Sequence, residues 1–285
     1  MKKIAYLFLL AVLLFAVLCG CDKGNGEGTP SDNPDDDTLL NVNVDILKIG
    51  KADCIIINTG SRILMIDTGE EENLDQINYF MYMNEYEKID TLILTHYDKD
   101  HIGGAAEIIK KYQVSSVIEP SIVSINEWYI KYHNVLDEMG ITPIKLSQDY
   151  RFEYDGCQID IKAPKRNMYS EKQDNNSSLV VSMECNQKRL LFCADAMELR
   201  ISELISEDLG EYDFVKLPYH GNYIENYRAF LNMVMPKYGA ITCSNKNPPN
   251  DQTLSILDEY GVDTYQTRYG DIHIFTDGKT ISVGQ

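Results

Sequence analysis

The hydrophobic positions near the start of the folded part of this chain follow the two-residue period of β-strands. Residues 42–49 alternate between apolar and polar side chains, and residues 54–58 and 63–66 form short apolar runs. The segments 59–61 and 67–69 consist of Thr, Gly, Ser and Asp, which favour tight turns. We therefore expect three antiparallel strands joined by tight turns.

Farther along the chain, apolar residues at helical spacing alternate with short apolar runs. Helices are predicted at residues 73–86, 105–112, 128–139, 197–206, 227–235 and 252–260. Strands are predicted at residues 91–94, 114–118, 143–146, 151–154, 158–162, 179–184, 189–193, 214–217 and 241–244, with short strands from 263 to 283. Each half thus begins with a strand-rich meander and continues with mixed β/α units. Two such halves, packed sheet against sheet with helices outside, would form a four-layer α/β sandwich.

The first 20 residues have the pattern of an export signal. Lys2 and Lys3 precede an unbroken apolar run from residue 4 to residue 18, which is too short for a comfortable membrane span. The following Cys19-Gly20-Cys21 is similar to a bacterial lipobox, so we expect residues 1–20 to be a lipoprotein signal peptide and Cys21 to become the lipidated first residue. An uncleaved anchor helix is the alternative. Either way the protein would be exported and tethered to the outer face of a bacterial membrane.

Residues 21–38 are predicted to be a flexible acidic tether. From Asp22 to Asp37 there is no large apolar residue, so this segment cannot bury enough surface to offset the entropy of ordering it. We interpret Asp35-Asp36-Asp37 as part of this solvated tether rather than as a calcium site. The folded domain is expected to cover residues 39–285.

The composition excludes a disordered protein and argues against polyanionic partners. Hydrophobic residues make up 44% of the chain, and 26 Lys and Arg stand against 44 Asp and Glu, a net charge of −18. Nucleic acids and anionic lipids are bound largely through Lys and Arg. The lysines near the predicted site are scattered and form no basic track; they include Lys99, Lys110, Lys111 and Lys216. The charge favours a small substrate over long nucleic acid, and a phosphate substrate would need a metal.

The seven cysteines do not have the pattern of a disulfide framework or a zinc knuckle. Removal of Cys19 and the lipidated Cys21 leaves five, with no C-x-x-C pair. We expect these five to be small buried side chains on strands. A hairpin bridge between Cys185 and Cys193 is the one exception considered.

Chemically reactive side chains are concentrated directly after the strand predicted at residues 91–94. Residues 95–104 read Thr-His-Tyr-Asp-Lys-Asp-His-Ile-Gly-Gly and contain two of the chain's five histidines. Imidazole and carboxylate groups are ligands of zinc-like cations, and the glycines let the backbone turn tightly around an ion. The predicted ligands are His96, Asp98, Asp100 and His101. A salt-bridged helix N-cap with incidental histidines is the alternative.

Two further candidate ligands also follow predicted strands. Asp195 comes after the apolar run at residues 190–193, and His220 follows the strand at residues 214–217 in a loop that contains Pro218 and Gly221. Three strand-end loops would then present acidic and histidine side chains to one another, although an N-cap role is the alternative for Asp195. The other histidines, His133 and His273, are interpreted as ordinary surface or packing residues.

With Met-Ile-Asp-Thr-Gly at residues 65–69, the decapeptide resembles the metal motif of the metallo-β-lactamase superfamily. The family motif H-x-H-x-D-H stands here as H-x-D-x-D-H, the form found in the extracellular lactamase-like domain of ComEC-type DNA-uptake proteins and related lipoproteins. Residues 175–181, 190–195 and 216–221 also match, and in element order the resemblance covers about residues 42–283. It implies the family's αββα sandwich.

The resemblance further implies a centre of two divalent cations. Zinc is the expected metal, with manganese or magnesium as alternatives because a carboxylate replaces one histidine of the first site. A hydroxide held between the cations would be the nucleophile, and Asp100 would have the catalytic role of orienting it. The implied ligands are His96 and Asp98 for the first cation, Asp100, His101 and His220 for the second, and Asp195 as the bridge.

The chain departs from the family pattern near the expected substrate. No histidine stands in the usual place between the first motif and Asp195, where Asn176 or Ser177 is found instead. Tyr219 replaces the first histidine of a His-His-Gly segment, and residues 247–249 read Asn-Pro-Pro where a His-Pro is common. Asn176 and Tyr219 are therefore predicted to lie close to the substrate, and these changes bear on rate and substrate rather than on fold.

The leading interpretation is a metal-dependent hydrolase of phosphodiester or other ester substrates outside the cytoplasm. β-Lactam hydrolysis is not expected, because those enzymes typically keep a three-histidine first site. The competing hypothesis is a tethered binding or scaffold protein with a degenerate metal site. A DNA-uptake nuclease that works with a channel would need a basic track, which the sequence does not show. The expected partners are a small ester or phosphodiester substrate and the membrane, and the sequence does not identify a protein partner.

Overall fold

The computed structural model describes residues 39–285. The predicted signal peptide at residues 1–20, the tether at residues 21–38 and the lipidated Cys21 lie outside the described residues and stay predictions. Within residues 39–285 no helix combines the length and the apolar character that a membrane crossing requires.

The first sheet has eight strands in the order β17-β16-β1-β2-β3-β5-β7-β8. β1, β2 and β3 form the predicted antiparallel meander, and β3, β5, β7 and β8 run parallel. The last two strands of the chain return to this sheet, where β16 pairs with β1. The strands are β1 (Val42–Ile46), β2 (Ile55–Asn58), β3 (Ile63–Ile66), β5 (Thr91–Ile93), β7 (Val117–Pro120), β8 (Ile144–Leu146), β16 (Ile272–Thr276) and β17 (Ile281–Gly284).

The second sheet has seven strands in the order β15-β14-β13-β12-β11-β10-β9. β9 to β12 are antiparallel, and β12 to β15 are parallel. The strands are β9 (Tyr150–Tyr154), β10 (Cys157–Lys162), β11 (Val180–Cys185), β12 (Lys188–Phe192), β13 (Phe214–Lys216), β14 (Tyr238–Ile241) and β15 (Asp263–Gln266). Each sheet therefore combines an antiparallel part with a parallel part. A separate small ladder pairs β4 (Lys88–Ile89) with β6 (Gln113–Val114).

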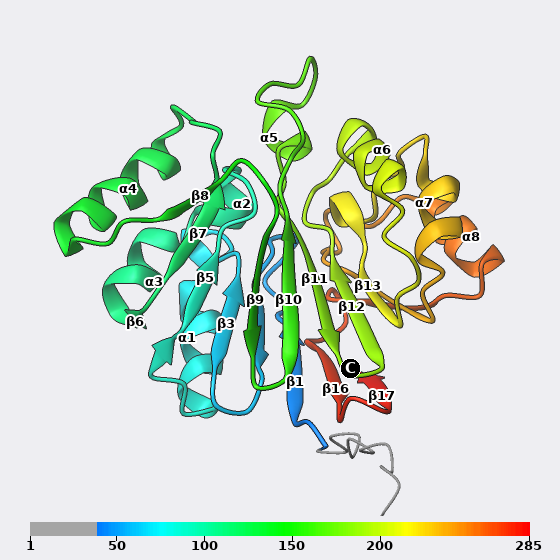
Figure 1. Ribbon diagram of the computed structural model, residues 1–285, viewed down its shortest axis with the longest axis horizontal. Helices are drawn as coiled ribbons and strands as arrows, with labels where there is room; N and C mark the ends of the chain where they lie inside the picture. Colours follow the sequence, from blue (N-terminus) through cyan, green and yellow to red (C-terminus); the bar gives the residue numbers. More distant parts are fainter. Residues whose placement is uncertain (1–38) are drawn as a thin grey trace, which may run out of the picture. The chain divides into compact units, whose positions relative to one another are not determined.

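Helices cover the outer face of each sheet (Figure 1). On the first sheet these are α1 (Leu74–Met83), α3 (Ala105–Lys111) and α4 (Glu127–Met139). On the second they are α6 (Glu198–Glu207), α7 (Tyr227–Val234) and α8 (Asp251–Glu259). Short helical turns lie in the loops that follow β3, β5, β10 and β13. These are the 3-10 turns η1 (Glu71–Asn73) and η2 (Pro218–Gly221) and the short helices α2 (Lys99–Ile102) and α5 (Gln173–Asn176).

The hydrophobic core consists of three layers that follow from strand alternation. In β2, Ile55 and Ile57 belong to a cluster shared by both sheets, whereas Ile56 packs toward the helices of the first sheet. The shared cluster also contains Ile159 and Met183 from the second sheet. A third cluster lies between the second sheet and its helices. Because successive strand residues point to opposite faces, these apolar runs are buried on both sides. The predicted four-layer αββα sandwich is confirmed.

The structure corrects the prediction that the five cysteines from Cys54 onward are free, and the one bridge considered, Cys185–Cys193, is not the one that forms. The bridge joins Cys157 to Cys185, with a Cα–Cα distance of 4.4 Å, and Cys193 is a free buried thiol. Cys157 and Cys185 stand directly opposite each other on β10 and β11. In the β11–β12 hairpin, by contrast, Cys185 stands opposite Lys188, so Cys193 is several residues out of register. Cys54 and Cys243 are free and buried, as predicted.

Candidate metal centre

The predicted ligands lie in three loops at the carboxyl ends of parallel strands. His96 and Asp98 follow β5, and Asp100 and His101 belong to the short α2 that comes next. Asp195 follows β12, and His220 lies in η2 after β13. The first loop belongs to one sheet and the other two to the second sheet, so the candidate site joins both halves of the sandwich.

The metal motif is shaped by the backbone around its two glycines. Gly103 and Gly104 have ordinary negative φ angles of −57° and −83°, so a left-handed turn is not what they provide. Instead, a Cβ atom on Gly104 would lie 2.5 Å from the carbonyl oxygen of Thr68. These glycines are needed because the start of α3 packs against the backbone that follows β3. Residues 103–104 do form a turn between α2 and α3, and the close packing explains why glycine is needed there.

Asp67, at the end of β3, orients the histidine in α2. Its Oδ2 lies 2.7 Å from Nδ1 of His101, and Thr95 donates its backbone N–H to Oδ1 at 2.8 Å and its hydroxyl to Oδ2 at 2.7 Å. Asp67 is completely buried and has a positive φ of 60°. A carboxylate accepts a hydrogen bond, so Nδ1 of His101 carries the proton and Nε2 offers a lone pair. Asp67, the aspartate of the matching segment 65–69, therefore orients the ligand His101.

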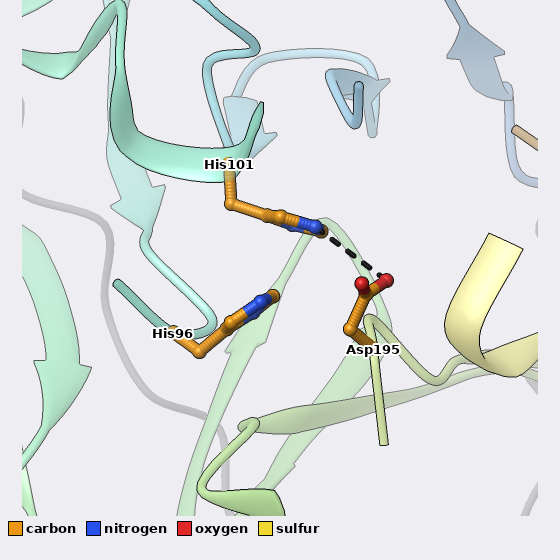
Figure 2. Close-up of side chains that lie close together, drawn as sticks. All are labelled: His96, His101 and Asp195. Carbon is orange, nitrogen blue, oxygen red and sulfur yellow. Dashed lines mark ion pairs between the residues drawn. The ribbon is translucent and has the colours of Figure 1, made fainter. Parts of the chain in front are cut away.

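Asp195 lies between two histidines from different loops. Its Oδ1 is 3.5 Å from Nε2 of His101, and its Oδ2 is 3.1 Å from Nε2 of His220. Figure 2 shows the rings of His96 and His101 extending toward this carboxylate. The centroids of the two rings lie 4.0 Å apart. Nε2 of His220 is also 3.4 Å from Oδ2 of Asp100. This arrangement suits a carboxylate shared by two ligand sets.

Several of these ligand atoms are buried without a hydrogen-bond partner. Within residues 39–285 this is true of Nε2 of His96, Nε2 of His101 and Oδ1 of Asp195. Buried polar atoms almost always have a hydrogen-bond partner, so a cluster of potential metal-ligand atoms without partners needs an explanation. In two sets, His96 with His101 and Asp195, and Asp100 with His101 and His220, the ligand atoms all lie within 4.8 Å of one another. Imidazole and carboxylate ligands at this spacing fit divalent cations.

The pKa values of the site residues show how strongly these carboxylates and histidines interact. Burial alone would raise the pKa of Asp195, but His220 and His101 hold it well below its usual range. Burial would lower the pKa of His101, but Asp195 and Asp67 raise it well above the usual value. The field that would stabilise a protonated imidazole stabilises a metal cation at the same place, and a metal would displace the proton.

Asp98 stands at the edge of the centre. Its Oδ2 lies 3.6 Å from Nε2 of His96, and its side chain is 37% exposed, whereas His96 is buried. Burial raises and His96 lowers the pKa of Asp98, with a net decrease. The pair predicted for the first cation is therefore adjacent, but it is more open to solvent than the ligands around Asp195.

Beneath the ligands lies an ion pair that sequence reasoning missed. The ammonium of Lys216 contacts Oδ2 of Asp53, and both side chains are buried. Lys216 also donates to the carbonyl of Ala194 at 3.2 Å, directly before Asp195. Asp53, Asp67 and His101 form another group of closely spaced possible ligand atoms. Because Lys216 is buried, it cannot contribute to a basic track on the surface. Its position within the apolar run 214–217 was the one sign in the sequence that this charge is buried.

Of the two residues predicted to lie close to the substrate, Asn176 uses its side-chain amide in contacts that hold the fold together. Its Oδ1 accepts from the backbone N–H of Arg200 at 3.1 Å, and its Nδ2 donates to the carbonyl of Glu171 at 3.0 Å. The neighbouring Asn175 instead reaches the centre, with Nδ2 3.3 Å from Oδ2 of Asp195. This places the amide of Asn175, and not that of Asn176, next to the metal ligands.

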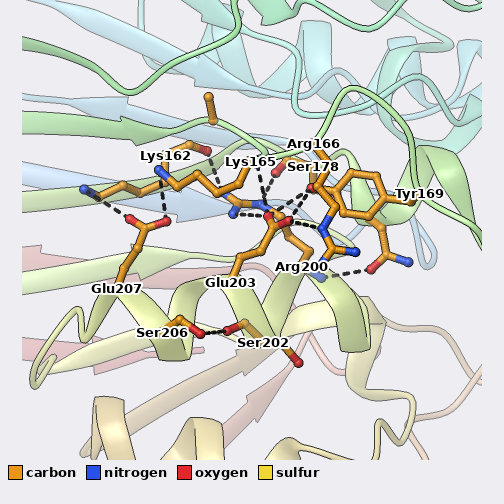
Figure 3. A network of polar contacts seen from close by, with 12 residues as sticks. Lys162, Lys165, Arg166, Tyr169, Ser178, Arg200, Ser202, Glu203, Ser206 and Glu207 are labelled. Atoms are coloured by element: carbon orange, nitrogen blue, oxygen red, sulfur yellow. Dashed lines mark hydrogen bonds and ion pairs between the residues drawn. The ribbon is translucent and has the colours of Figure 1, made fainter.

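The segment that carries Asn175 is fastened to α6 by a polar network (Figure 3). The buried guanidinium of Arg200 donates to the backbone carbonyls of Ser178 and Lys162 and to Glu203. Glu203 in turn accepts from the hydroxyl of Tyr169. Because these contacts hold both ends of the segment 163–178, the position of Asn175 is fixed from outside the candidate centre.

The loop that presents His220 has an unusual backbone. Tyr219 and His220 have positive φ angles of 51° and 52°, as does Ala194 at 49°. Non-glycine residues adopt this conformation at an energetic cost, which is typical of functional sites. Nδ1 of His220 lies 2.9 Å from the hydroxyl of Thr242, and this contact directs Nε2 toward Asp195. Tyr219 is half-buried beside these ligands, and burial raises the pKa of its hydroxyl.

The two remaining histidines lie away from the centre. His133 on α4 contacts Glu119 at 3.1 Å, and His273 on β16 is 57% exposed and contacts Asp45 at 2.6 Å. Neither belongs to a group of possible metal ligands found among residues 39–285.

Comparison with known proteins links this geometry to a family. Residues 48–244 match the Metallo-beta-lactamase superfamily. Recombination protein 2 from Haemophilus influenzae is 25% identical over 219 residues, which cover 75% of this chain and 26% of that protein. ComE operon protein 3 from Bacillus subtilis is 22% identical over 246 residues, or 79% of this chain and 31% of that protein. These two relatives bear out the resemblance to ComEC-type proteins.

The chain spans about a quarter to a third of the length of these two relatives. Among solved structures, CmlA, a diiron beta-hydroxylase from Streptomyces venezuelae, has a TM-score of 0.56 and 13% identity, covering 87% of this chain and 55% of that chain. At this identity the similarity supports the fold alone.

Proposed function

This chain belongs to the metallo-beta-lactamase superfamily, and from that premise we propose that it hydrolyses phosphodiester or other ester bonds outside the cytoplasm. The superfamily fold and the clustered His and Asp side chains indicate a metal-dependent hydrolase. The observation that carries the proposal is the set of buried, unpaired ligand atoms around Asp195.

The residues present fit a pair of divalent cations. His96 and Asp98 would hold one, and Asp195 lies where it can serve both. The ligands of the other would be Asp100, His101 and His220. Divalent cations in such a site act as Lewis acids and lower the pKa of water. Zinc fits the histidines, and manganese or magnesium fits the carboxylates.

The chain's own residues would orient the reacting groups. Burial raises the pKa of Asp100, but His220 and His101 lower it far more, so Asp100 stays ionised. An ionised carboxylate can accept a hydrogen bond from an attacking water and orient it. The amide of Asn175 could donate to a substrate oxygen beside Asp195.

The proposed location rests on two features of different kinds. The Cys157–Cys185 disulfide is typical of proteins from oxidising compartments. Residues 1–20 have the pattern of a lipoprotein signal peptide that would be removed before Cys21. We therefore include in the proposal that the protein is exported and held at the outer face of a bacterial membrane by lipid on Cys21.

A tethered binding protein is the second candidate function, and one observation favours it. The amide of Asn176, which stands where many family members have a histidine, is bonded to Arg200 and Glu171 and turned away from the ligands. The first cation would thus have few side-chain ligands. The buried Lys216 and the charge of −18 argue against long nucleic acid as the bound partner.

The two candidates differ in turnover. We expect the full chain, loaded with zinc or manganese, to hydrolyse bis(p-nitrophenyl) phosphate. Asp100→Ala and His220→Ala should reduce kcat/KM by at least about 100-fold, a typical effect of removing one electrostatic catalytic group. His273→Ala, which changes a histidine far from the centre, is the matched control. Turnover that is equal in all four proteins, or absent with every metal, would reject the hydrolase in favour of the binding protein.

A further inference from the structure

We propose that Lys51 selects anionic substrates for the candidate metal centre, so that the substrate class is a phosphate ester with a negative charge. The inference rests on the proposed function and deepens it. It concerns the loop between β1 and β2, which carries none of the predicted metal ligands.

The backbone around Lys51 is fixed on both sides. Ile49 and Ala52 are buried in the cluster between the first sheet and its helices, and Gly50 between them has a φ of 86°. Asp53, two residues after Lys51, donates its backbone N–H to the carbonyl of Asp100 at 3.0 Å. The loop is thereby tied directly to α2, and the side chain of Lys51 starts from a defined position beside the metal motif.

The ammonium of Lys51 stands at the boundary between the ligands and the solvent. Its Nζ is 2.7 Å from Oδ2 of Asp100, and its side chain is 42% exposed while that of Asp100 is 10% exposed. The ammonium of Lys51 is therefore accessible to solvent while it contacts a predicted ligand that is nearly buried.

The other cations near the motif are turned elsewhere. Lys216 is buried beneath the ligands against Asp53. Lys99, inside the motif, pairs with Glu70 at 2.8 Å and Glu72 at 3.0 Å. Among these three lysines, only Lys51 combines contact with a predicted ligand and exposure to solvent.

The positive charge of Lys51 would repel a metal cation bound at Asp100, and a bound anion would relieve this repulsion. An ammonium next to Asp100 repels a divalent cation bound by the same carboxylate, because like charges a few ångström apart interact strongly in a partly buried site. An anionic oxygen between the metal and Lys51 would be attracted to both. Lysine binds phosphate as a compact point charge. In a chain with a net charge of −18, recognition of an anion has to be local.

This assignment predicts a difference between charged and neutral substrates. In the metal-loaded full chain, Lys51→Met should raise KM for bis(p-nitrophenyl) phosphate about tenfold, which corresponds to about 1.4 kcal/mol, with a smaller change in kcat. KM for the neutral ester p-nitrophenyl acetate should stay unchanged. The same variant should weaken the binding of inorganic phosphate, measured by calorimetry, about tenfold. Lys51→Arg, which keeps the charge, should restore most of the phosphate binding.

Lys48→Met is the matched control, because Lys48 is an exposed lysine earlier in the same loop. If Lys51 serves only as a counter-ion for Asp100, Lys51→Met will tighten metal binding and leave phosphate binding unchanged, which overturns the inference. If the wild type hydrolyses neither substrate but binds phosphate through Lys51, the hydrolase proposal fails while the assignment of Lys51 stands. Equal phosphate binding in wild type and Lys51→Met overturns the assignment whatever the turnover.

Discussion

The carboxylate of Asp67 accepts hydrogen bonds from the backbone and hydroxyl of Thr95 and lies 2.7 Å from the ring of His101. These contacts fix both the position and the tautomer of a ring whose other nitrogen faces Asp195. Such supporting contacts typically contribute strongly to metal affinity even though the residue does not touch the metal.

Replacing Asp67 with Asn tests this role. The amide would present an N–H to Nδ1 of His101 and favour the tautomer whose proton sits on Nε2, which removes the ligand lone pair. We expect metal affinity, measured by competitive titration with a chelating dye, to fall about 10- to 100-fold. Asp155→Asn is the control, since Asp155 also accepts from a threonine hydroxyl and a backbone N–H, at Thr59 and Ser61. Equal losses in both variants would contradict the assigned role.

At the residue scale, the sequence identified the compact motif and the distant ligands Asp195 and His220, but not the buried ion pair beside them. His96, Asp98, Asp100 and His101 stand within a few positions of one another, so their chemistry is visible in the sequence. Lys216 and Asp53 are far apart in the chain and become a buried pair only when the two sheets are packed. The position of Lys216 within an apolar run was a signal that its charge is buried, but no residue near it in the sequence identifies Asp53 as its partner.

At the scale of elements, strand register decides which cysteines can be joined. Cys157 and Cys185 face each other across β10 and β11, at one end of a ladder of six residue pairs. Hairpin neighbours along the chain are not necessarily opposite each other, which is why a bridge to Cys193 was the wrong pairing. Register depends on where each strand begins, and apolar runs define those ends only to within a few residues.

The disulfide should contribute measurably to stability. A bridge that closes a loop with a sequence separation of 28 constrains the unfolded chain, so its loss should lower the free energy of unfolding by about 3 kcal/mol. Urea denaturation of the wild type with and without reductant, compared with Cys157→Ala/Cys185→Ala, measures this. The reductant should destabilise only the wild type. A reductant effect of the same size in the double variant would show that it acts elsewhere.

The main topological feature missed from the sequence is the path of the last two strands. Short strands were expected between residues 263 and 283, but β16 and β17 leave the second half and extend the first sheet beside β1. Alternating side chains show that a strand has one buried face, yet they do not show which sheet it joins. The arrangement of layers was predictable because each half contains its own meander and helices. The return of β16 and β17 to the first sheet was not predictable from these patterns.

On the scale of the whole described domain, the candidate centre lies where the two sheets meet at the ends of their parallel strands. One sheet supplies His96 and His101, and the other supplies Asp195 and His220. A bound cation would therefore link the halves and stabilise the folded state in proportion to its affinity. The acidic charge of the chain is consistent with this, since part of it belongs to the ligands.

The metal content of the purified full chain tests this account most directly. After dialysis against metal-free buffer, elemental analysis should find about two divalent cations per wild-type chain, as expected of a two-metal hydrolase site. Asp195→Ala should lose most of this content, because Asp195 lies between both ligand sets, whereas His273→Ala should keep it. A wild type without metal, or equal metal content in the wild type and Asp195→Ala, would contradict the central claim that these side chains form a metal centre.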